Sequence, residues 1–482
     1  MTEPQTGTGG DLACDICVIG AGSGGLSVAA GAVQMGARTV LIEKGKMGGD
    51  CLNYGCVPSK SLIAAAHKAH AWRTAPQFGV TYGESTVDMA RVRAHVRDVI
   101  AAIEPHDSVE RFEDLGVTVI KGAARFTGAD TVQVDERRIR AKRFVVATGS
   151  SPMVPPVPGL DTVPFMTNET VFDLDKPVRH LLVMGGGPIG AELAQAHRRL
   201  GAEVTVIEMI AVLGKDDPEC AALVKQRLTD EGVTLLEGTA VTQAAMEGDE
   251  IVLTLGTDGA TRTVRGSHLL VAAGRRPNID GLDLRAAGID ATPAGIAVDA
   301  RLRTSNKRIF AIGDVAGGYQ FTHVAGYHAG IVIRNALFRL PARADHRAVP
   351  WVTYTDPELA HVGLTEAAAR QQHGDRIKVL RWPFAENDRA QAERATDGMI
   401  KVVVDRRGRV LGATIVGPTA GELLLPWVMT VQRRGKIGPM ASVIAPYPTL
   451  GEVSKRAAGA YYTPSLFSER TRRIVRFLLR FP

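Results

Sequence analysis

A glycine-rich turn between a short apolar segment and a helical stretch occurs twice in this chain, at residues 20–25 and 185–190. Each turn follows a segment typical of a buried parallel strand, and each is followed by a helix, a second apolar strand and an acidic residue. This order of elements is that of one half of a doubly wound α/β sheet. The sequence therefore predicts an α/β protein with two Rossmann-like domains.

In the first copy, an apolar segment at residues 16–20 runs into GAGSGG, and a second at residues 38–42 ends in an acid. Amides at the start of the intervening helix are suited to bind a pyrophosphate, and an acid about 20 residues further on accepts from a ribose hydroxyl. The candidate residues of this dinucleotide site are Gly20, Gly22, Gly25 and Glu43.

The second copy has the turn GGGPIG between a strand at residues 180–184 and a helix at residues 191–200, and the strand at residues 204–207 again ends in an acid. Its candidate residues are Gly185, Gly187, Gly190 and Glu208. Two complete units in one chain predict two different dinucleotides. The alternative is that both are ordinary glycine-rich turns of an α/β sheet.

Two further strand ends indicate that the first domain is discontinuous. Residues 143–147 close on Thr148 and Gly149, and residues 308–312 close on a Gly-Asp pair that contains Asp314. The carboxyl ends of parallel strands are where open sheets bind ligands. We therefore expect the second dinucleotide domain to be inserted within the first.

Beyond residue 350 the pattern changes to strands such as 399–404 and 410–416, which we expect to alternate with long helices in an α+β domain. The predicted limits are 11–160 and 281–345 for the first domain, 161–280 for the second, 346–460 for the third and 461–482 for a basic tail.

The net charge of +6 comes from the C-terminal end, where residues 455–482 contain seven basic side chains and one acid. The rest of the chain is balanced and aromatic residues make up only 5%, so we exclude nucleic-acid binding by the body. Five cysteines do not make an extracellular disulfide framework. Residues 1–6 lack the features of a signal peptide and no apolar run approaches the ~18 residues of a membrane span, so we predict a cytoplasmic protein.

The segment GGDCLNYGCVPSK at residues 48–60 contains the strongest chemical signal. Cys51 and Cys56 are five positions apart at a predicted helix start, close enough to form a small-loop disulfide, and the helix N-terminus lowers a thiol pKa. Lys60 lies four residues after Cys56, on the same helical face, where its ammonium stabilises a thiolate. The alternative is a pair of buried cysteines without chemistry.

This segment resembles the redox-active disulfide signature of the class I pyridine nucleotide-disulfide oxidoreductases, which include dihydrolipoamide dehydrogenase, glutathione reductase and mercuric reductase. The resemblance extends from about residue 12 to 460 and includes both glycine turns and both strand ends. It implies that the first dinucleotide is FAD and the second a nicotinamide nucleotide. It further implies a homodimer, in which the third domain forms the interface and completes the active site across it.

Carried over by position, the resemblance implies that Cys56 faces the flavin and that Cys51 exchanges with substrate. Electrons would pass from NADH through the flavin to Cys56 and then from the cysteine pair to substrate. Glu192 matches the acid that pairs with Lys60, and Asp314 matches the ligand of the flavin ribityl chain. The other implied cofactor contacts are Lys44, Gly49, Lys60, Thr148, Gly149 and Gly274.

Glu208 predicts the choice of nicotinamide. An acid at this position accepts from the free 2′-hydroxyl of NAD and repels the 2′-phosphate of NADP, and no arginine follows closely to receive that phosphate. We expect NADH to be used with at least about tenfold better catalytic efficiency than NADPH.

The C-terminal part departs from the dihydrolipoamide dehydrogenase and glutathione reductase pattern, in which His-Pro-x-x-x-Glu supplies a base. Here Tyr447 takes the place of the histidine and Glu452 retains the acid, and no histidine follows His373. A tyrosine is a poor proton acceptor at neutral pH. A tyrosine at this position is similar to mercuric reductase. That enzyme also ends in a pair of cysteines, whereas no cysteine follows Cys220 here.

The substrate is therefore predicted only as a small disulfide or a thiol-bound metal. Two alternatives remain, an NADH diaphorase that reduces a quinone or dye and a membrane- or partner-docked redox-sensing flavoprotein. The C-terminal tail supports the second alternative. Ser468 resembles a helix start, and the apolar and basic residues that follow it occupy separate faces of the expected helix. The apolar residues are Ile474, Phe477, Leu478 and Phe481, and the basic ones are Arg473, Arg476 and Arg480. Such a helix either contacts a membrane surface or packs on the dimer partner.

The remaining cysteines and two histidines are expected to have structural rather than chemical roles. Cys14 and Cys17 fall at odd separation in the first strand, so we expect their side chains to point to opposite faces and to be structural. Cys220 stands on a predicted helix and is expected to pack. His323 and His328 follow Asp314 into a predicted helix, where we expect packing, and no cluster has the ligand spacing of structural zinc.

Overall fold

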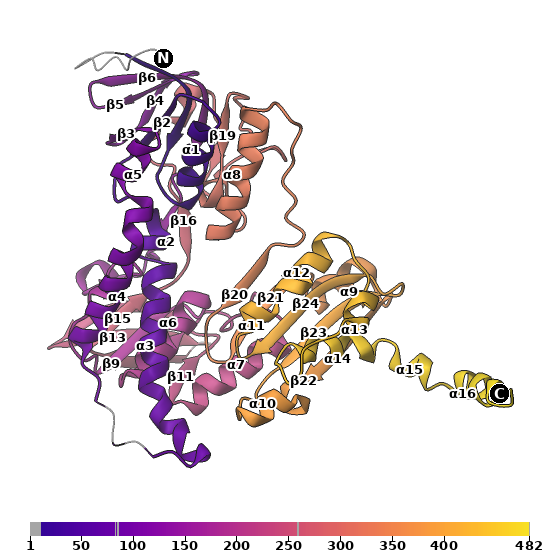
Figure 1. The fold of residues 1–482 in the computed structure, drawn as a ribbon. Helices are drawn as coiled ribbons and strands as arrows, with labels where there is room; N and C mark the ends of the chain where they lie inside the picture. Colours follow the sequence, from indigo (N-terminus) through magenta and orange to yellow (C-terminus); the bar gives the residue numbers. More distant parts are fainter. Residues whose placement is uncertain (1–10, 82, 84–85, 258–259, 482) are drawn as a thin grey trace.

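The computed structural model describes residues 11–81, 83, 86–257 and 260–481. Within them the chain builds three domains, each around its own main sheet (Figure 1). Residues 1–6, on which the targeting prediction depends, lie outside the described range.

The first domain is organised by a seven-stranded sheet in the order β3-β2-β1-β6-β5-β4, with β19 pairing β6. Its parallel strands are β1 (Leu12–Ile19), β2 (Thr39–Glu43), β3 (Thr118–Lys121), β6 (Arg137–Val146) and β19 (Ile309–Ala311). The antiparallel edge consists of β4 (Arg125–Gly128) and β5 (Thr131–Val134). The late strand β19 joins a sheet begun by β1, so the prediction of a discontinuous first domain is confirmed.

Two helices from opposite parts of the sequence cover one face of this sheet. They are α1 (Ser23–Gln34) and α8 (Thr322–Ala336), which lie side by side in Figure 1. Their apolar side chains and those of the sheet form one buried cluster.

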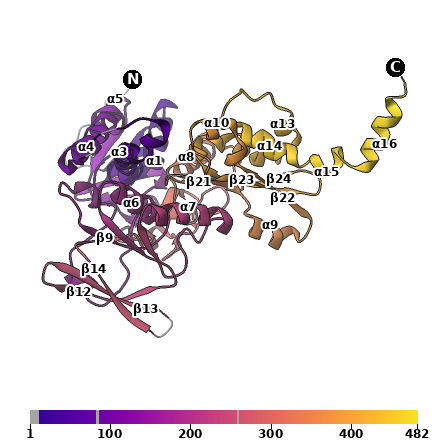
Figure 2. The same cartoon turned by 90° about the horizontal axis from the view of Figure 1, so that it is seen from below.

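The second domain contains a five-stranded parallel sheet in the order β11-β10-β9-β15-β8. Its strands are β8 (Phe165–Met166), β9 (His180–Met184), β10 (Glu203–Ile207), β11 (Val233–Leu236) and β15 (His268–Val271). The flanking helices are α6 (Pro188–Arg199) and α7 (Pro218–Asp230). A separate antiparallel sheet of β12 (Ala240–Glu247), β13 (Glu250–Thr257) and β14 (Ala260–Gly266) extends outward in Figure 2.

The chain crosses between these two domains through a small antiparallel pair, β7 (Ser150–Pro152) and β16 (Arg275–Pro277). Next to this pair, the Thr148 hydroxyl donates to the Asn278 carbonyl at 2.7 Å, and the Asn278 side-chain amide donates to the Thr148 carbonyl at 2.9 Å. The outgoing and returning strands are therefore tied together where the domains meet.

The third domain is an antiparallel sheet in the order β20-β21-β24-β23-β22. Its strands are β20 (Pro350–Thr353), β21 (Glu358–Gly363), β22 (Ile377–Pro383), β23 (Met399–Asp405) and β24 (Val410–Gly417). The helices include α9 (Glu366–His373), α11 (Ala420–Leu423), α12 (Leu425–Gln432), α13 (Gly438–Ser442) and α14 (Glu452–Ala460). The expectation of long helices is wrong, because prolines at the first turns of α12 and α13 and glycines between the helices divide the segment into short pieces.

A long helix connects the first domain to the second. The short helix α2 (Gly49–Asn53) leads into α3 (Cys56–Thr74), which contacts α6 of the second domain and α4 (Met89–Ile103) (Figure 1). The N-terminal end of α3 therefore lies where the two dinucleotide domains meet.

Cys14 and Cys17 do not point to opposite faces, so that prediction is wrong. Both are buried in the same apolar cluster on one side of the first sheet, whereas Ile16 belongs to the cluster on the other side. The amides of Asp15 and Ile16 both donate to the Arg38 carbonyl, at 2.9 and 3.2 Å, which is the hydrogen-bond pattern of a β-bulge. The additional residue turns Cys14 to the side that Cys17 occupies.

The chain ends in α15 (Thr463–Leu466) and α16 (Glu469–Leu478), which extend away from the third domain in both views (Figures 1 and 2). The Ser468 hydroxyl accepts from the Thr471 amide, so the predicted helix start is confirmed. No helix among the described residues is long and apolar enough to cross a membrane.

Candidate functional site

A cavity of about 1630 Å³ brings together the two glycine turns, the cysteine segment and part of the third domain. Most of the predicted site residues line it, namely Gly20, Gly22, Glu43, Lys44, Gly49, Cys51, Cys56, Lys60, Thr148, Gly149, Gly185, Gly187, Glu192, Glu208, Gly274 and Asp314. The sequence motifs, spread over almost 300 positions, thus meet in one continuous space.

Gly25 and Gly190 lie beneath this surface and have a structural reason to be glycine. A Cβ atom on Gly25 would lie 1.8 Å from the Gly20 carbonyl oxygen, and one on Gly190 would lie 2.0 Å from that of Gly185. Each glycine therefore lets a helix pack directly against its own turn. These two predicted residues do not line the cavity but shape the turns beneath it.

The first turn has the geometry of a pyrophosphate cradle. Gly20 has a φ of +104°, and a Cβ there would lie 2.4 Å from the Ala147 carbonyl oxygen. Gly22 precedes helix α1 as its N-cap, no side chain is bonded to the first amides of the helix, and these donors border the cavity. Free amides at a helix N-terminus bind phosphate, so the residues present fit the pyrophosphate of a dinucleotide such as FAD.

Glu43 lies at the rim of this cradle. Its two carboxylate oxygens accept from the amides of Ala21 and Gly45, each at 2.6 Å. These bonds hold the carboxylate beside the turn, in the position expected for a ribose contact.

The second turn repeats this construction. Gly185 has a φ of +111°, and Gly187 precedes α6 as an N-cap without a side-chain hydrogen bond. Glu208 accepts from the Gly186 amide at 2.7 Å and from the Ile210 amide at 3.0 Å. The residues present therefore fit a second dinucleotide on the opposite side of the cavity.

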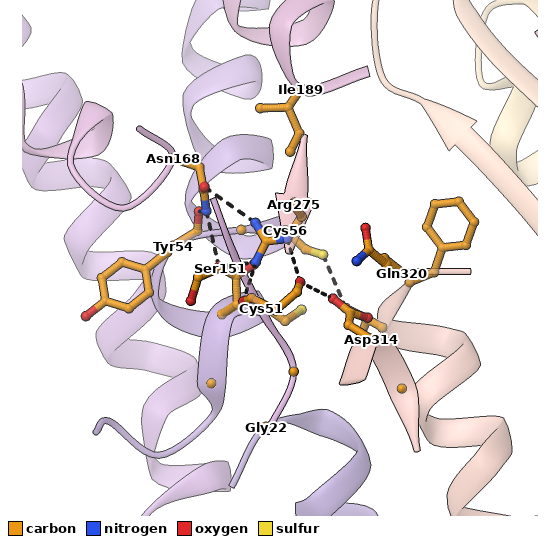
Figure 3. A pocket seen from close by; sticks show the side chains of 18 of the residues that line it. Gly22, Cys51, Tyr54, Cys56, Ser151, Asn168, Ile189, Arg275, Asp314 and Gln320 are labelled. Carbon is orange, nitrogen blue, oxygen red and sulfur yellow. Dashed lines mark hydrogen bonds and ion pairs between the residues drawn. The ribbon is translucent and has the colours of Figure 1, made fainter. Parts of the chain in front are cut away.

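The cysteine pair lies between the two cradles (Figure 3). Cys51 lies on α2 and Cys56 is the first residue of α3. The two cysteines therefore lie on two consecutive helices, not together at the start of one helix as expected. Both are free thiols, and the Cys56 Sγ lies 3.5 Å from the Thr322 Oγ1 on α8.

The two thiols have opposite electrostatic character. Hydrogen bonding from Cys51 lowers the pKa of Cys56 to about 6, although burial opposes the shift, and Thr322 and the charge of Lys60 add to it. The same hydrogen bond, together with burial, raises the pKa of Cys51. Cys56 is therefore the thiolate at neutral pH and Cys51 its hydrogen-bond donor.

Lys60 is held by groups from two other domains. Its Nζ is 2.9 Å from the Oε2 of Glu192, which is only 6% exposed. The Tyr354 amide donates to the other Glu192 oxygen at 2.9 Å, and the Tyr354 ring lies 4.2 Å from the Lys60 Nζ. The cation is thereby fixed one helical turn from Cys56.

Arg275 is an important residue that the sequence reasoning missed. It lies 3.0 Å from the Asp50 Oδ1, and its Nε donates to the Ser150 Oγ at 2.8 Å (Figure 3). Asn168 also donates to the Asp50 Oδ1 at 3.1 Å. The one available signal was position, since Arg275 directly follows Gly274, and its contacts fix the residue that precedes Cys51.

Asp314 is connected to Arg275 through Ser150. The Ser150 hydroxyl donates to its Oδ2 at 2.6 Å, while burial raises the pKa of Asp314. Serine and arginine from the crossing strands therefore position the carboxylate at the edge of the cavity, where it fits a hydroxyl-bearing chain such as the flavin ribityl.

Tyr447 and Glu452 are not brought to the cysteines within the chain. Neither lines the cavity, and Tyr447 is 68% exposed. Its hydroxyl donates to the Asp388 Oδ2 at 2.8 Å, a hydrogen bond that raises the pKa of Tyr447. That these residues complete the site of a partner subunit stays a prediction.

The two histidines of α8 make hydrogen bonds; His323 lines the cavity and His328 is buried. The His323 Nε2 lies 2.9 Å from the Pro350 carbonyl oxygen. The buried His328 accepts from the Gly313 amide at 3.2 Å, and its other nitrogen lies 2.7 Å from the Nε2 of His346. His328 thereby supports the turn that presents Asp314.

Comparison with known proteins identifies the family. The family described as pyridine nucleotide-disulphide oxidoreductase matches residues 14–329, and its dimerisation domain matches residues 349–458. The chain belongs to this family, whose members depend on FAD and take electrons from a pyridine nucleotide, and the dimerisation domain indicates homodimer formation in the family.

The relatives define the type within the family. The chain is 36% identical to mercuric reductase of Bacillus cereus, over 95% of this chain and 73% of that protein. It is 35% identical to dihydrolipoyl dehydrogenase of Geobacillus stearothermophilus, over 93% of this chain and 97% of that protein. Among solved structures, the Cu(II) complex of the HOCl-induced flavoprotein disulfide reductase RclA from Escherichia coli has a TM-score of 0.83 at 28% identity, over 92% of this chain and 99% of that one. The protein is therefore a flavoprotein disulfide oxidoreductase of this type.

Proposed function

We propose that the protein is an NADH-dependent, FAD-containing oxidoreductase that uses Cys51 and Cys56 to reduce a small disulfide or a thiol-bound metal. The observation that carries the proposal is one cavity in which two dinucleotide cradles flank the two thiols. The pKa of Cys56 is lowered and that of Cys51 is raised. We propose residues 11–160 and 281–345 as the FAD domain, 161–280 as the NAD domain and 346–460 as the dimer interface.

FAD bound at the first cradle would carry two electrons between the nicotinamide and the thiol pair. The chain's own residues hold it, with Gly20, Gly22 and Glu43 at the dinucleotide end and Asp314 at the ribityl chain. Lys60, fixed by Glu192, provides a positive charge beside Cys56, which stabilises its thiolate.

Thiol–disulfide exchange would proceed in two steps. Cys51 loses its proton and attacks a substrate sulfur, forming a mixed disulfide and releasing one substrate thiolate. The Cys56 thiolate then attacks the Cys51 sulfur, which releases the second substrate thiolate and leaves the Cys51–Cys56 disulfide. The two electrons gained by the substrate are those lost by the cysteine pair.

The first step requires a group that accepts the proton of Cys51. The hydroxyl of Tyr447 donates to Asp388 and the pKa of Tyr447 is raised, so a tyrosine placed there by the partner subunit would be a poor acceptor. A thiol-bound metal exchanges ligands between thiolates and depends less on such a base. This contrast favours the metal-thiol substrate over lipoamide.

The test measures NADH oxidation with lipoamide, with Hg(II) in excess thiol and with a redox dye, for the full-length protein and its Cys56→Ser variant. Cys56→Ser should lose turnover of the first two substrates by at least about 10³-fold, since a required nucleophile is removed, and should keep dye reduction. Cys220→Ala, which removes a thiol outside the cavity, is the matched control and should behave as the wild type. Undiminished turnover of both substrates by Cys56→Ser would refute the proposal in favour of a diaphorase.

A further inference from the structure

The C-terminal arm, residues 461–481, is the part of the chain that the proposed redox chemistry does not use. The match to the family's dimerisation domain ends at residue 458, so the arm follows the region that the family shares. None of the residues of α16 is buried, and the helix extends away from all three domains (Figures 1 and 2). Helix α16 therefore presents both its faces to the surroundings of the subunit.

One face of the arm is apolar. Ile474, Phe477, Leu478 and Phe481 follow the spacing of one helical face, and they are between 49% and 62% exposed. The Phe477 and Phe481 rings contact each other with centroids 5.3 Å apart. Aromatic and aliphatic side chains gathered in this way on a protruding helix mark an interaction surface.

The arm also contains a group of basic side chains. Helix α16 and the residues after it contain five arginines and one carboxylate, Glu469, which lies 3.2 Å from Arg472 and 3.6 Å from Arg476. Across the described residues, no carboxylate lies within ion-pair distance of the remaining three, Arg470, Arg473 and Arg480. The arm therefore carries a positive charge that nothing in the described part of its own chain neutralises.

We propose that the C-terminal arm binds the surface of an anionic lipid bilayer. Its apolar face would enter the boundary between headgroups and acyl chains, while its arginines contact lipid phosphates. The charge favours this occupant over the body of a partner subunit, because residues 1–454 contain equal numbers of acidic and basic side chains. The body of a second copy therefore offers no net negative charge to match the arm.

Dimerisation would strengthen this contact. Homodimer formation in this family gives the assembly two arms, and two weak contacts on one surface bind more tightly than either alone. The attraction is electrostatic in part, so it weakens as salt shortens the screening length.

The experiment is co-sedimentation of the full-length holoenzyme with vesicles of phosphatidylglycerol and phosphatidylcholine, and with phosphatidylcholine vesicles alone. We expect the protein to pellet with the first and to remain in solution with the second, and the pelleted fraction to fall with added salt. Two variants separate the contributions, Arg473→Gln/Arg476→Gln/Arg480→Gln and Phe477→Ser/Leu478→Ser. Each should reduce the bound fraction at least about tenfold at low salt.

The matched control is Arg137→Gln/Arg138→Gln, which removes two exposed arginines from β6 in the first domain and should pellet as the wild type does. NADH-to-dye turnover should be equal in all variants, which separates a failure of this proposal from a failure of the redox proposal. Equal pelleting of the wild type and both arm variants would overturn membrane binding. Dissociation of the arm variants into monomers would overturn it as well, by showing that the arm holds the partner subunit.

Discussion

The two glycine turns are built by the same contacts but have different neighbours. Both begin with a glycine of positive φ, both pack a later glycine against the first carbonyl, and both hold an acid on their own amides. The first turn is then crossed by the cysteine segment, since Gly22 pairs with Gly48 and a Cβ on Gly49 would lie 2.6 Å from the Gly22 Cα. The second is flanked by Met209 and Ile210, which are 67% and 76% exposed.

This difference shows how one local design acquires two roles. A cradle enclosed by other backbone suits a dinucleotide that stays bound, whereas an open cradle suits one that exchanges in each turnover. The chemistry of the first site also depends on the second unit, because Glu192 lies two residues after Gly190 and pairs with Lys60.

Alanine at Gly25 and at Gly190 should have the largest effects and should separate the two cradles. The new methyl group would displace the helix from its turn in both variants, since it would lie 1.8 or 2.0 Å from a carbonyl oxygen. Gly25→Ala should purify with little FAD. Gly190→Ala should keep its FAD and lose about 100-fold or more in kcat/KM for NADH, which flavin absorbance and steady-state kinetics measure.

Gly330→Ala is the control for both variants. A Cβ at this position in α8 meets no atom within 4 Å, so alanine should leave activity unchanged and stabilise the protein by about 0.5–1 kcal/mol. Equal loss of FAD in the Gly25 and Gly190 variants would contradict the division of roles.

Replacing Glu43 and Glu208 by glutamine tests whether the two cradles differ in how they recognise a ribose. Glu208→Gln removes the charge that repels a 2′-phosphate, so the expected preference for NADH of at least about tenfold should fall to within about threefold. Glu43→Gln makes the same change at the first cradle and should leave the preference as it is. Comparison of kcat/KM for NADH and NADPH measures both. Equal use of the two nucleotides by the wild type would show that Glu208 does not discriminate between them.

Lys60→Met tests the connection between the units. The charge of Lys60 helps to lower the pKa of Cys56 to about 6, so its loss should raise this pKa and decrease the thiolate fraction at pH 7. The measurement is the pH dependence of the alkylation rate of the reduced enzyme. Lys44→Met removes a lysine that lines the same cavity but does not contribute to the shift of Cys56, and it serves as the control. An unchanged midpoint in Lys60→Met would exclude Lys60 as a source of the shift.

Tyr447→Phe should have the smallest effect. It removes one exposed hydrogen bond to Asp388, so the melting temperature should stay close to that of the wild type. Turnover of lipoamide should change by less than about threefold if the hydroxyl accepts no proton. Tyr447→His should raise lipoamide turnover near neutral pH, and a loss of turnover in Tyr447→Phe would assign the hydroxyl a chemical role.

The two cradles could be predicted from the sequence because their requirements are local. A positive φ at Gly20 and the absence of a side chain at Gly25 are backbone demands that only glycine meets. The strands on either side of each turn are short buried runs, and the structure places β2, β9 and β10 close to the predicted limits, whereas β1 begins earlier, at Leu12. The cysteine pair could also be predicted, because both thiols and Lys60 lie within one short segment.

The rest depends on partners distant in the sequence. Arg275 binds Asp50 and Ser150 only because two crossing strands meet between the domains, and no local pattern predicts that meeting. The bulge that turns Cys14 toward the side of Cys17 comes from pairing with β2. Short helices replace the long ones expected in the third domain, because prolines in the first turns of α12 and α13 mark where new helices begin.

The distribution of the five thiols gives the protein a natural readout of its own oxidation state. Cys14, Cys17 and Cys220 are at most 4% exposed, whereas Cys51 and Cys56 border the cavity. A thiol reagent applied to the folded protein therefore counts two groups when the active pair is reduced and none when it is oxidised. Titrating that count against a thiol–disulfide buffer gives the midpoint potential of the pair without following the flavin or adding a substrate.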